Sequence, residues 1–322
     1  MPAGLHPNAL DQLMMIKPSP HLIFAIALIL PGCKTLEPKM ASGLGSHSEL
    51  YDGKSELAYS TQFPVTSVPE ALARGDLAVA NGDLDKGLFE YIRALDLDEG
   101  NPEALARIGQ IHFQRGNQPL AELAFRWSLQ KDPRNPETLT GLGILLLKKR
   151  DYPSARQALE EAVRIEPRLP RAHNALGVIA DLEQDYRLAQ HHYQEALAGA
   201  PGSANLLNNL GYSRYLAGDY KGAIAAFRDS LLADPNYQLA WRNLGLVYAR
   251  QGRYPEAVQA FSKVQDLPKA YNDVGYLAMV GGKLDDAKGF FEEAKRQSAE
   301  FYSLADTNER RVAILQGQEA AP

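Results

Sequence analysis

From residue 68 onward, apolar side chains recur every three or four positions, in runs of about a dozen residues that short polar turns separate. This spacing is typical of amphipathic α-helices that bury one face. In the stretch NNLGYSRYLAGDYKGAIAAFRDSLLADP, it predicts one helix over residues 204–217 and a second over 220–233. The turn Ala217-Gly218-Asp219-Tyr220 joins the two, so the pattern predicts a helical hairpin.

The hairpin pattern repeats with a period of 34 residues. A glycine marks each copy at that spacing, except that the last interval is four positions shorter: Gly75, Gly109, Gly143, Gly177, Gly211, Gly245 and Gly275. A small side chain stands twelve positions after each glycine, and a large one, aromatic or leucine, stands sixteen positions after it. The small side chains let two helices approach closely, and the large side chain fills the space between them.

Proline stands twenty-four positions after four of the glycines, as in Asp132-Pro133, and ends the second helix because it cannot continue one. A two-helix unit with this period resembles the tetratricopeptide repeat (TPR). The resemblance implies an all-α fold, a right-handed superhelical solenoid of about seven repeats over residues 68–296. An apolar stripe after this region predicts a C-terminal cap helix over 297–316, before a tail at 317–322. The sixth copy is four residues short, which predicts a tighter turn into the seventh.

The N-terminal residues follow another pattern. Leu22–Leu30 is a run of nine apolar residues, which as a helix would span roughly 14 Å and is too short to cross a membrane. With the basic flank Lys17, the run suits the apolar segment of a signal peptide. Because residues 1–12 lack Lys and Arg, we hypothesise that translation starts at Met14 or Met15.

The sequence Leu30-Pro31-Gly32-Cys33, which contains the only cysteine of the chain, resembles a bacterial lipobox. The resemblance implies that residues 1–32 are a lipoprotein signal peptide and that Cys33 carries a thioether-linked lipid. An ordinary signal peptide with an incidental cysteine is the alternative. Lys34 follows the cysteine where aspartate would signal retention in the inner membrane, so the periplasmic side of the outer membrane is favoured. Residues 33–67, rich in Ser, Gly, Thr and Pro, are expected to form a flexible tether.

Composition narrows the function classes. The net charge is −5 with both signs interspersed, which disfavours nucleic acid as a partner. A single cysteine permits neither an intramolecular disulfide nor a cysteine-based zinc site. His191 and His192 are adjacent on a helix and face different directions, so they do not chelate one metal together. We find no nucleophile–base constellation and no phosphate loop, so we expect no enzymatic activity and no cofactor besides the lipid on Cys33.

Helical geometry predicts which side chains face the concave side of the solenoid. Because successive side chains are rotated by about 100° around a helix, the residues six and three before the repeat glycine, and one, four and five after it, point away from the packed face. This rule predicts a partner-binding groove lined by Phe113, Ile144, Leu147, Asn174, Val178, Leu182, Asn208, Tyr212, Tyr215, Arg242, Asn272 and Tyr276. The apolar members suit an amphipathic helix, and the asparagines can hold a peptide backbone, because amides both donate and accept. The alternative is that superhelix curvature buries these groups among themselves.

The combination of lipobox, polar tether, tandem repeats and cap helix resembles the TPR lipoproteins of pilus assembly, of the TadD type in the Tad (Flp) system. The closer likeness lies in AYNDVGYLAMVGGKLDDAKGFFEEA followed by NERRVAILQGQ, which is similar to the C-terminal end of that family. The resemblance implies a pilotin-like protein, anchored to the outer membrane, that binds the secretin. Two other binding roles remain open: the pilotin of a type IV pilus, and a periplasmic scaffold that recruits cell-wall hydrolases or proteases.

Overall fold

The computed structural model describes residues 48–52, 65–300 and 302–317. The predicted signal peptide, Cys33 and most of the predicted tether lie outside these residues. The described part consists of a short 3-10 turn, η2 (Ser48–Leu50), and fifteen α-helices, with no strand among them. None of these helices is long and apolar enough to cross a membrane.

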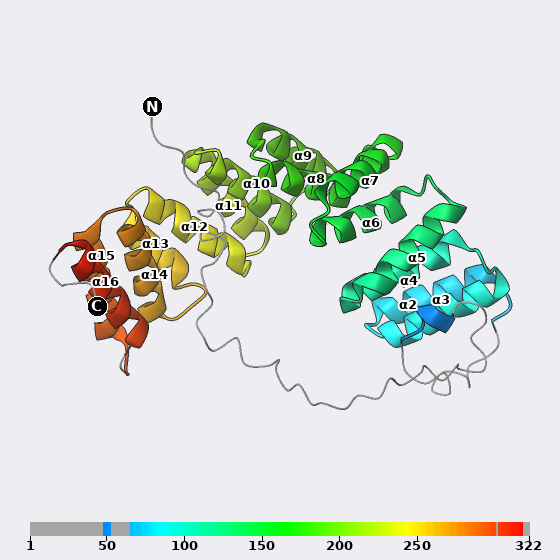
Figure 1. Ribbon diagram of the computed structural model, residues 1–322, viewed down its shortest axis with the longest axis horizontal. Coiled ribbons are helices and arrows are strands. Elements are labelled where there is room, and N and C mark those ends of the chain that lie inside the picture. The colour runs from blue at the N-terminus through cyan, green and yellow to red at the C-terminus, as the bar shows by residue number, and fades with distance from the viewer. Residues whose placement is uncertain (1–47, 53–64, 301, 318–322) are drawn as a thin grey trace. The chain divides into compact units, whose positions relative to one another are not determined.

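The helices form seven consecutive pairs and a single C-terminal helix (Figure 1). The first helices of the pairs are α2 (Val68–Ala80), α4 (Pro102–Arg115), α6 (Pro136–Lys148), α8 (Pro170–Leu182), α10 (Ala204–Leu216), α12 (Gln238–Arg250) and α14 (Leu267–Val280). The second helices are α3 (Leu84–Leu97), α5 (Gln118–Lys131), α7 (Tyr152–Ile165), α9 (Tyr186–Gly199), α11 (Tyr220–Ala233), α13 (Tyr254–Phe261) and α15 (Leu284–Gln297), and the last helix is α16 (Ser303–Leu315). The predicted all-α repeat fold is confirmed.

Each pair is held together by the residues that the period singled out. A Cβ atom placed on Gly211 of α10 would lie 2.7 Å from the Phe227 ring of α11, and the other repeat glycines meet the equivalent side chain. Gly218 leaves α10 in the left-handed conformation, with φ of 82°. The Asp219 carboxylate then accepts a hydrogen bond from the Gly222 amide and caps α11. Helices α5, α7, α9 and α11 each end two residues before a proline, as predicted.

The sixth repeat departs from this plan in its second helix. Helix α13 has eight residues where the other second helices have 14. The predicted tighter turn into the seventh repeat is wrong, because six positions separate Phe261, the end of α13, from Leu267, the start of α14. The shorter repeat is therefore absorbed by a shorter helix.

Successive pairs pack mainly through the second helix of one repeat against the first helix of the next, and the first helices also contact one another. Helix α4 contacts α6, α6 contacts α8, and the same contact continues through α10, α12 and α14 to α16. Among the described helices, the second helices of successive repeats make no comparable contact. The first helices therefore form one continuous layer, in which α16 takes the place of a further first helix.

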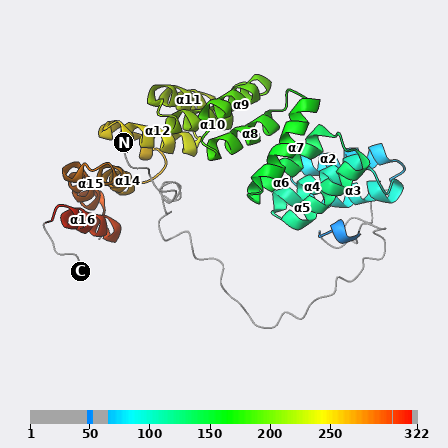
Figure 2. The same cartoon turned by 45° about the horizontal axis from the view of Figure 1, so that its top comes forward.

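A segment of the predicted tether is docked on the first two repeats. Both views show η2, in blue, beside these helices (Figures 1 and 2). Leu50 is completely buried, and its carbonyl accepts a 2.7 Å hydrogen bond from Nε2 of His112 on α4. Asp52 accepts bonds from Arg115 Nη1 at 2.6 Å and Asn117 Nδ2 at 3.1 Å. Residues 48–52 thus depart from the flexible tether predicted over 33–67, because a buried leucine and three hydrogen bonds fix them.

Candidate protein-binding surface

The apolar part of the predicted groove follows three first helices. Phe113 on α4, Ile144 and Leu147 on α6 and Val178 on α8 are half-buried and pack against the core with part of their surface. Leu182, the last residue of α8, is 45% exposed. The strip therefore contributes to packing, and its solvent-facing remainder is open to a partner.

The aromatic and basic members lie further along the same layer of helices. The ring centroids of Tyr212 and Tyr215 on α10 are 6.1 Å apart, and burial raises the pKa of both hydroxyls. Tyr276 on α14 is 42% exposed, and Arg242 on α12 is exposed. Leu182, Arg242 and Tyr276 are thus the most accessible members of the predicted set.

The asparagines of the predicted groove join neighbouring repeats. Three amide pairs link successive first helices, with N···O distances of 2.9, 2.9 and 3.0 Å: Asn209 to Asn174, Asn243 to Asn208, and Asn308 to Asn272. Asn208 and Asn272 are buried. The rule for a single helix missed this, because each acceptor faces a second asparagine that the next first helix supplies. For Asn208 and Asn272, the expectation of a row open to a peptide backbone is corrected, and mutual burial, the alternative, describes them, whereas Asn174 is half-buried.

Charge replaces the amides at the step from the sixth to the seventh repeat. Arg242 of α12 stands at the repeat position that Asn174, Asn208 and Asn272 occupy in their repeats. Its positive charge interacts electrostatically with the Asp273 carboxyl of α14. Burial raises the pKa of the Asp273 carboxyl, and hydrogen bonds from Gln265 and Asn272 together with the Arg242 charge oppose that rise. The Gln265 Nε2 to Asp273 Oδ2 distance is 2.8 Å. Polar contacts therefore connect the last three first helices, α10, α12 and α14, and the C-terminal helix α16.

Side chains two repeats apart meet on the predicted groove face. Arg171 Nη2 on α8 donates to Gln110 Oε1 on α4 at 3.4 Å, although 61 positions separate them in the chain. The angular rule placed both residues in the groove. Their contact indicates that the first-helix layer is concave on this side, at least from α4 to α8.

Comparison with known protein families agrees with this geometry. The family described as tetratricopeptide repeat matches residues 72–136, 140–184, 183–238 and 217–270, which together are more than half of the chain. The chain belongs to the tetratricopeptide repeat family. That family is a repeat scaffold for protein binding and not a catalytic family. No curated protein matches the chain.

Solved TPR structures share the fold. A TPR protein from Parabacteroides merdae ATCC 43184 has a TM-score of 0.52 and 15% identity, covering 76% of this chain and 98% of that one. Pseudomonas aeruginosa PilF has a TM-score of 0.51 and 20% identity over 69% and 99% of the two chains. A chain of the APC/C hetero-tetramer Cut9–Hcn1 has a TM-score of 0.54 and 17% identity over 76% and 52%. At these identities, the likeness shows the fold alone.

A hollow of about 510 Å³ opens on the groove face of the first TPRs. It lies between α2 and α4, and its lining includes Leu72, Asp76, Glu103 and Arg107. Arg107 pairs with Asp76 at 3.2 Å and with Glu103 at 2.9 Å. Our sequence prediction missed this site, although Leu72, Asp76 and Glu103 stand at positions that the angular rule assigns to the groove. Applying the rule to the first repeat would have found it.

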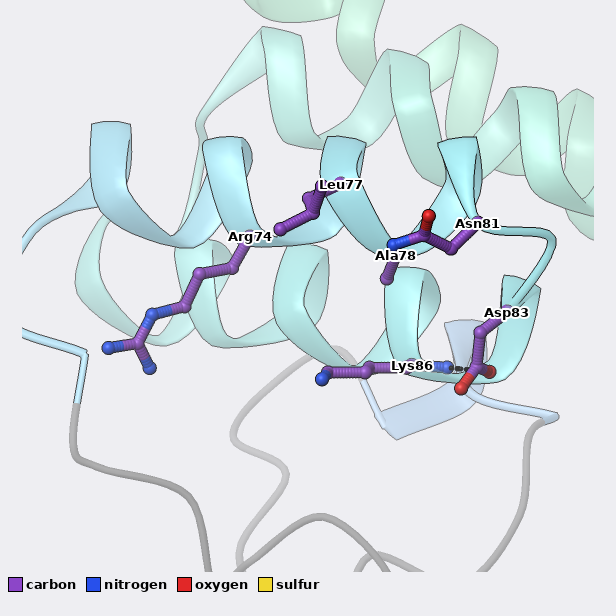
Figure 3. Close-up of a pocket in the computed structure, with 6 residues that line it drawn as sticks. All are labelled: Arg74, Leu77, Ala78, Asn81, Asp83 and Lys86. Carbon is purple, nitrogen blue, oxygen red and sulfur yellow. Dashed lines mark hydrogen bonds between the residues drawn. The ribbon is translucent and has the colours of Figure 1, made fainter.

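A second hollow, of about 300 Å³, lies on another side of α2 (Figure 3). Arg74 and Ala78 on α2, with Asp83 and Lys86 at the start of α3, line it. These residues stand one before and three, eight and eleven after Gly75, and we call these four repeat positions the outer-face positions. The Lys86 amide donates to Asp83 Oδ1 at 3.0 Å. The hollow belongs to the first TPR of the described residues.

Two histidines from one repeat lie in contact away from the groove. Nδ1 of His173 on α8 is 3.1 Å from Nδ1 of His192 on α9. Burial, with smaller effects from His173, His191 and Arg156, lowers the pKa of His192 to about 4. No group of three or more His, Cys, Asp or Glu within the described ranges could hold a metal ion.

Proposed function

We propose that this TPR protein is a lipid-anchored adaptor that binds a segment of a partner protein on its first-helix face. The observation that carries this proposal is the half-buried apolar strip from Phe113 to Val178, continued by the exposed Leu182 and Tyr276. An amphipathic helix laid on such a strip buries its own apolar side against it. Binding grooves on extended concave surfaces are the usual function of solenoids. Cut9, a protein with the same fold, stands in a hetero-tetramer with Hcn1.

The partner that we propose is the secretin of a Tad (Flp) pilus, with this protein as its pilotin-like assembly factor. Support comes from the lipobox-like Leu30-Pro31-Gly32-Cys33 and from the C-terminal likeness to TadD-type lipoproteins. The lipid on Cys33 would hold the protein on the periplasmic side of the outer membrane. The groove would hold a secretin segment, so capture becomes effectively intramolecular. The protein has no enzymatic step in this role.

The docked segment limits how far the repeats can move from the membrane. Residues 34–47 lie between the proposed lipid site and η2. Fully extended, they span at most about 50 Å. The bound segment of the partner must therefore lie no further from the outer membrane than the sum of that distance and the length of the repeat region.

Isothermal titration calorimetry with the purified protein and the periplasmic C-terminal segment of the secretin tests the groove. We expect Leu182→Asp and Tyr276→Asp to raise the dissociation constant by at least about tenfold, because each buries a charge against an apolar partner. Leu97→Asp is the matched control, since Leu97 is 49% exposed at the end of the second helix α3. If all three variants bind the segment as wild type does, the assignment of the groove is wrong. Binding of a type IV pilus secretin or a cell-wall hydrolase in its place would favour the alternative roles.

The lipid anchor has its own test. Mass spectrometry of the mature N-terminus should find the chain beginning at an acylated Cys33. Cys33→Ser should leave the protein in the soluble periplasmic fraction of cells that lack the secretin. Recovery of this variant with the outer membrane in such cells would contradict lipid anchoring and leave the groove assignment untouched.

A further inference from the structure

A cleft of about 640 Å³ opens between α11 and α13, with α12 as its floor. Its lining includes Arg228, Leu231, Leu232, Trp241, Arg253 and Lys263. Leu232 is 82% exposed. The α12 residues in the floor lie roughly 160° around the helix axis from those on the groove face. The cleft is therefore a surface separate from the one proposed to bind the secretin.

Two departures from the repeat pattern occur at this cleft. Helix α13 has eight residues instead of 14 and ends at Phe261, so it lacks the last turns that the other second helices have. In the first five repeats, an Asp or Asn eight residues after the glycine caps the second helix through its side chain. Arg253 stands there in the sixth repeat and Lys283 in the seventh, and neither caps its helix. Loss of the cap lowers the stability of the helix, so a cation at this position indicates a role other than capping.

The lining of the cleft is apolar and positively charged. The Arg253 guanidinium lies 4.4 Å from the Tyr248 ring centroid and pairs with Glu256 at 2.9 Å. The Lys263 ammonium lies 5.9 Å from the Trp241 ring centroid. Arg228 Nη2 donates to the Tyr248 hydroxyl at 3.1 Å. Three cations thus face one carboxylate, which leaves a net positive lining that attracts an acidic ligand.

The docked segment shows how such a surface is filled elsewhere in the same chain. His112 and Asn117, which bond to Leu50 and Asp52, stand three and eight residues after Gly109. These are two of the outer-face positions. Tyr248 and Arg253 occupy them after Gly245 and line the open cleft. The second repeat therefore binds an apolar residue and a carboxylate two positions later. In the sixth repeat, Tyr248 is buried at the floor of the cleft and Arg253 is exposed at its edge.

We propose that the cleft between α11 and α13 binds a short acidic segment of another protein, with the same chemistry as residues 49–52. An apolar side chain of that segment enters beside Leu232 and Trp241. A carboxylate two residues later meets Arg253, with Arg228 and Lys263 adding to the attraction. Because the groove stays free, the protein can hold two partners at once.

The probe for this site is a fluorescein-labelled peptide with the sequence of residues 46–54, SHSELYDGK, titrated with the full chain in a fluorescence anisotropy assay. Saturable binding is expected, and it should weaken as salt is added. A second peptide, with serine for the leucine and asparagine for the aspartate, should bind at least about tenfold more weakly.

Two matched variants locate the bound peptide. Leu232→Glu adds a negative charge at an exposed position of the cleft and should raise the dissociation constant at least about tenfold. Ala198→Glu adds the same charge at the equivalent exposed position of the preceding repeat and should change it by less than about twofold. Circular dichroism confirms that both variants are folded.

Four outcomes overturn the proposal. The first is the absence of saturable binding, and the second is equal binding by wild type and Leu232→Glu. The third is that Arg115→Ala loses binding while Leu232→Glu binds the peptide more weakly by less than about twofold, which would place the peptide at the α4 site. The fourth is a dimer of the protein in sedimentation, if Leu232→Glu disrupts this dimer. The cleft would then bind a second copy of the protein, and the proposed partner class would be wrong.

Discussion

Replacing Gly211 with alanine tests how closely the two helices of a repeat approach. The new Cβ would lie 2.7 Å from Phe227 Cε1 and 2.8 Å from Cδ1, whereas unstrained carbon atoms lie at about 3.5 Å or more. Phe227 is completely buried, so its ring or the helix must move by roughly 0.8 Å against close-packed neighbours. Overpacking of this kind costs about 1–3 kcal/mol, while alanine gains about 1 kcal/mol over glycine in helix propensity.

Gly289 provides the matched control within α15. It is exposed, and a Cβ placed on it has no neighbouring atom within 4 Å, so Gly289→Ala should show the propensity gain alone. Both variants gain the same helix propensity, so this gain cancels when their free energies of unfolding are subtracted. The remaining difference is the packing cost, about 1–3 kcal/mol. Urea unfolding followed by far-UV circular dichroism measures it, with midpoints compared because repeat arrays are not always two-state.

A Gly211→Ala variant as stable as Gly289→Ala would refute the close approach of α10 and α11. The double variant Gly211→Ala with Phe227→Leu sharpens the test. Removing the ring should make the alanine cost less than it does in the wild-type background, as a positive coupling between the two sites. Independent, additive effects would mean that the ring and the glycine do not touch.

Three further predictions concern contacts that the period alone does not show. Leu50→Ser should release residues 48–52, at a cost of up to about 2 kcal/mol, and raise hydrogen exchange in that segment, whereas Leu232→Ser at an exposed leucine should not. Asn308→Ala removes the donor to the buried Asn272 Oδ1 and should lower the free energy of unfolding by about 1–3 kcal/mol in urea titrations. The pKa of His192 is lowered from 6.5 to about 4 in the folded protein, so the unfolded chain binds the extra proton. Stability should therefore fall as the pH drops from about 7 towards 4, and His192→Gln should reduce that loss, as measured by thermal unfolding across the range.

The repeat architecture could be predicted because each unit contains its own signals. Gly211 and Phe227 stand sixteen positions apart and meet inside one hairpin, so a fixed spacing in the sequence reports their contact directly. The prolines after α5, α7, α9 and α11 end those helices for local reasons, and the structure agrees with them. The angular rule also held for Arg171 and Gln110, which meet on the face that it assigned to them.

The missed features depend on contacts between repeats. Asn208 and Asn272 point as the helix rotation requires, but the next first helix supplies a second amide that buries them, and a single-helix rule does not contain that neighbour. Leu50 has no periodic partner, and its contact with His112 spans 62 positions. Two signals in the sequence could have indicated these features. Leu50 is an apolar residue between two acids in a polar stretch, and Arg253 stands at a repeat position that holds a helix cap in the first five repeats.

In the proposed function, the first-helix face binds the secretin while a lipid on Cys33 holds the protein at the outer membrane. Site-specific photo-crosslinking in cells tests it most directly, with a benzophenone amino acid placed at Tyr276 or Leu182 in separate strains and at Leu97 as the control. A crosslinked band that contains the secretin is expected from the first two positions and none from Leu97. Crosslinks to the secretin from Leu97 alone, or from none of the three positions, would contradict this proposal.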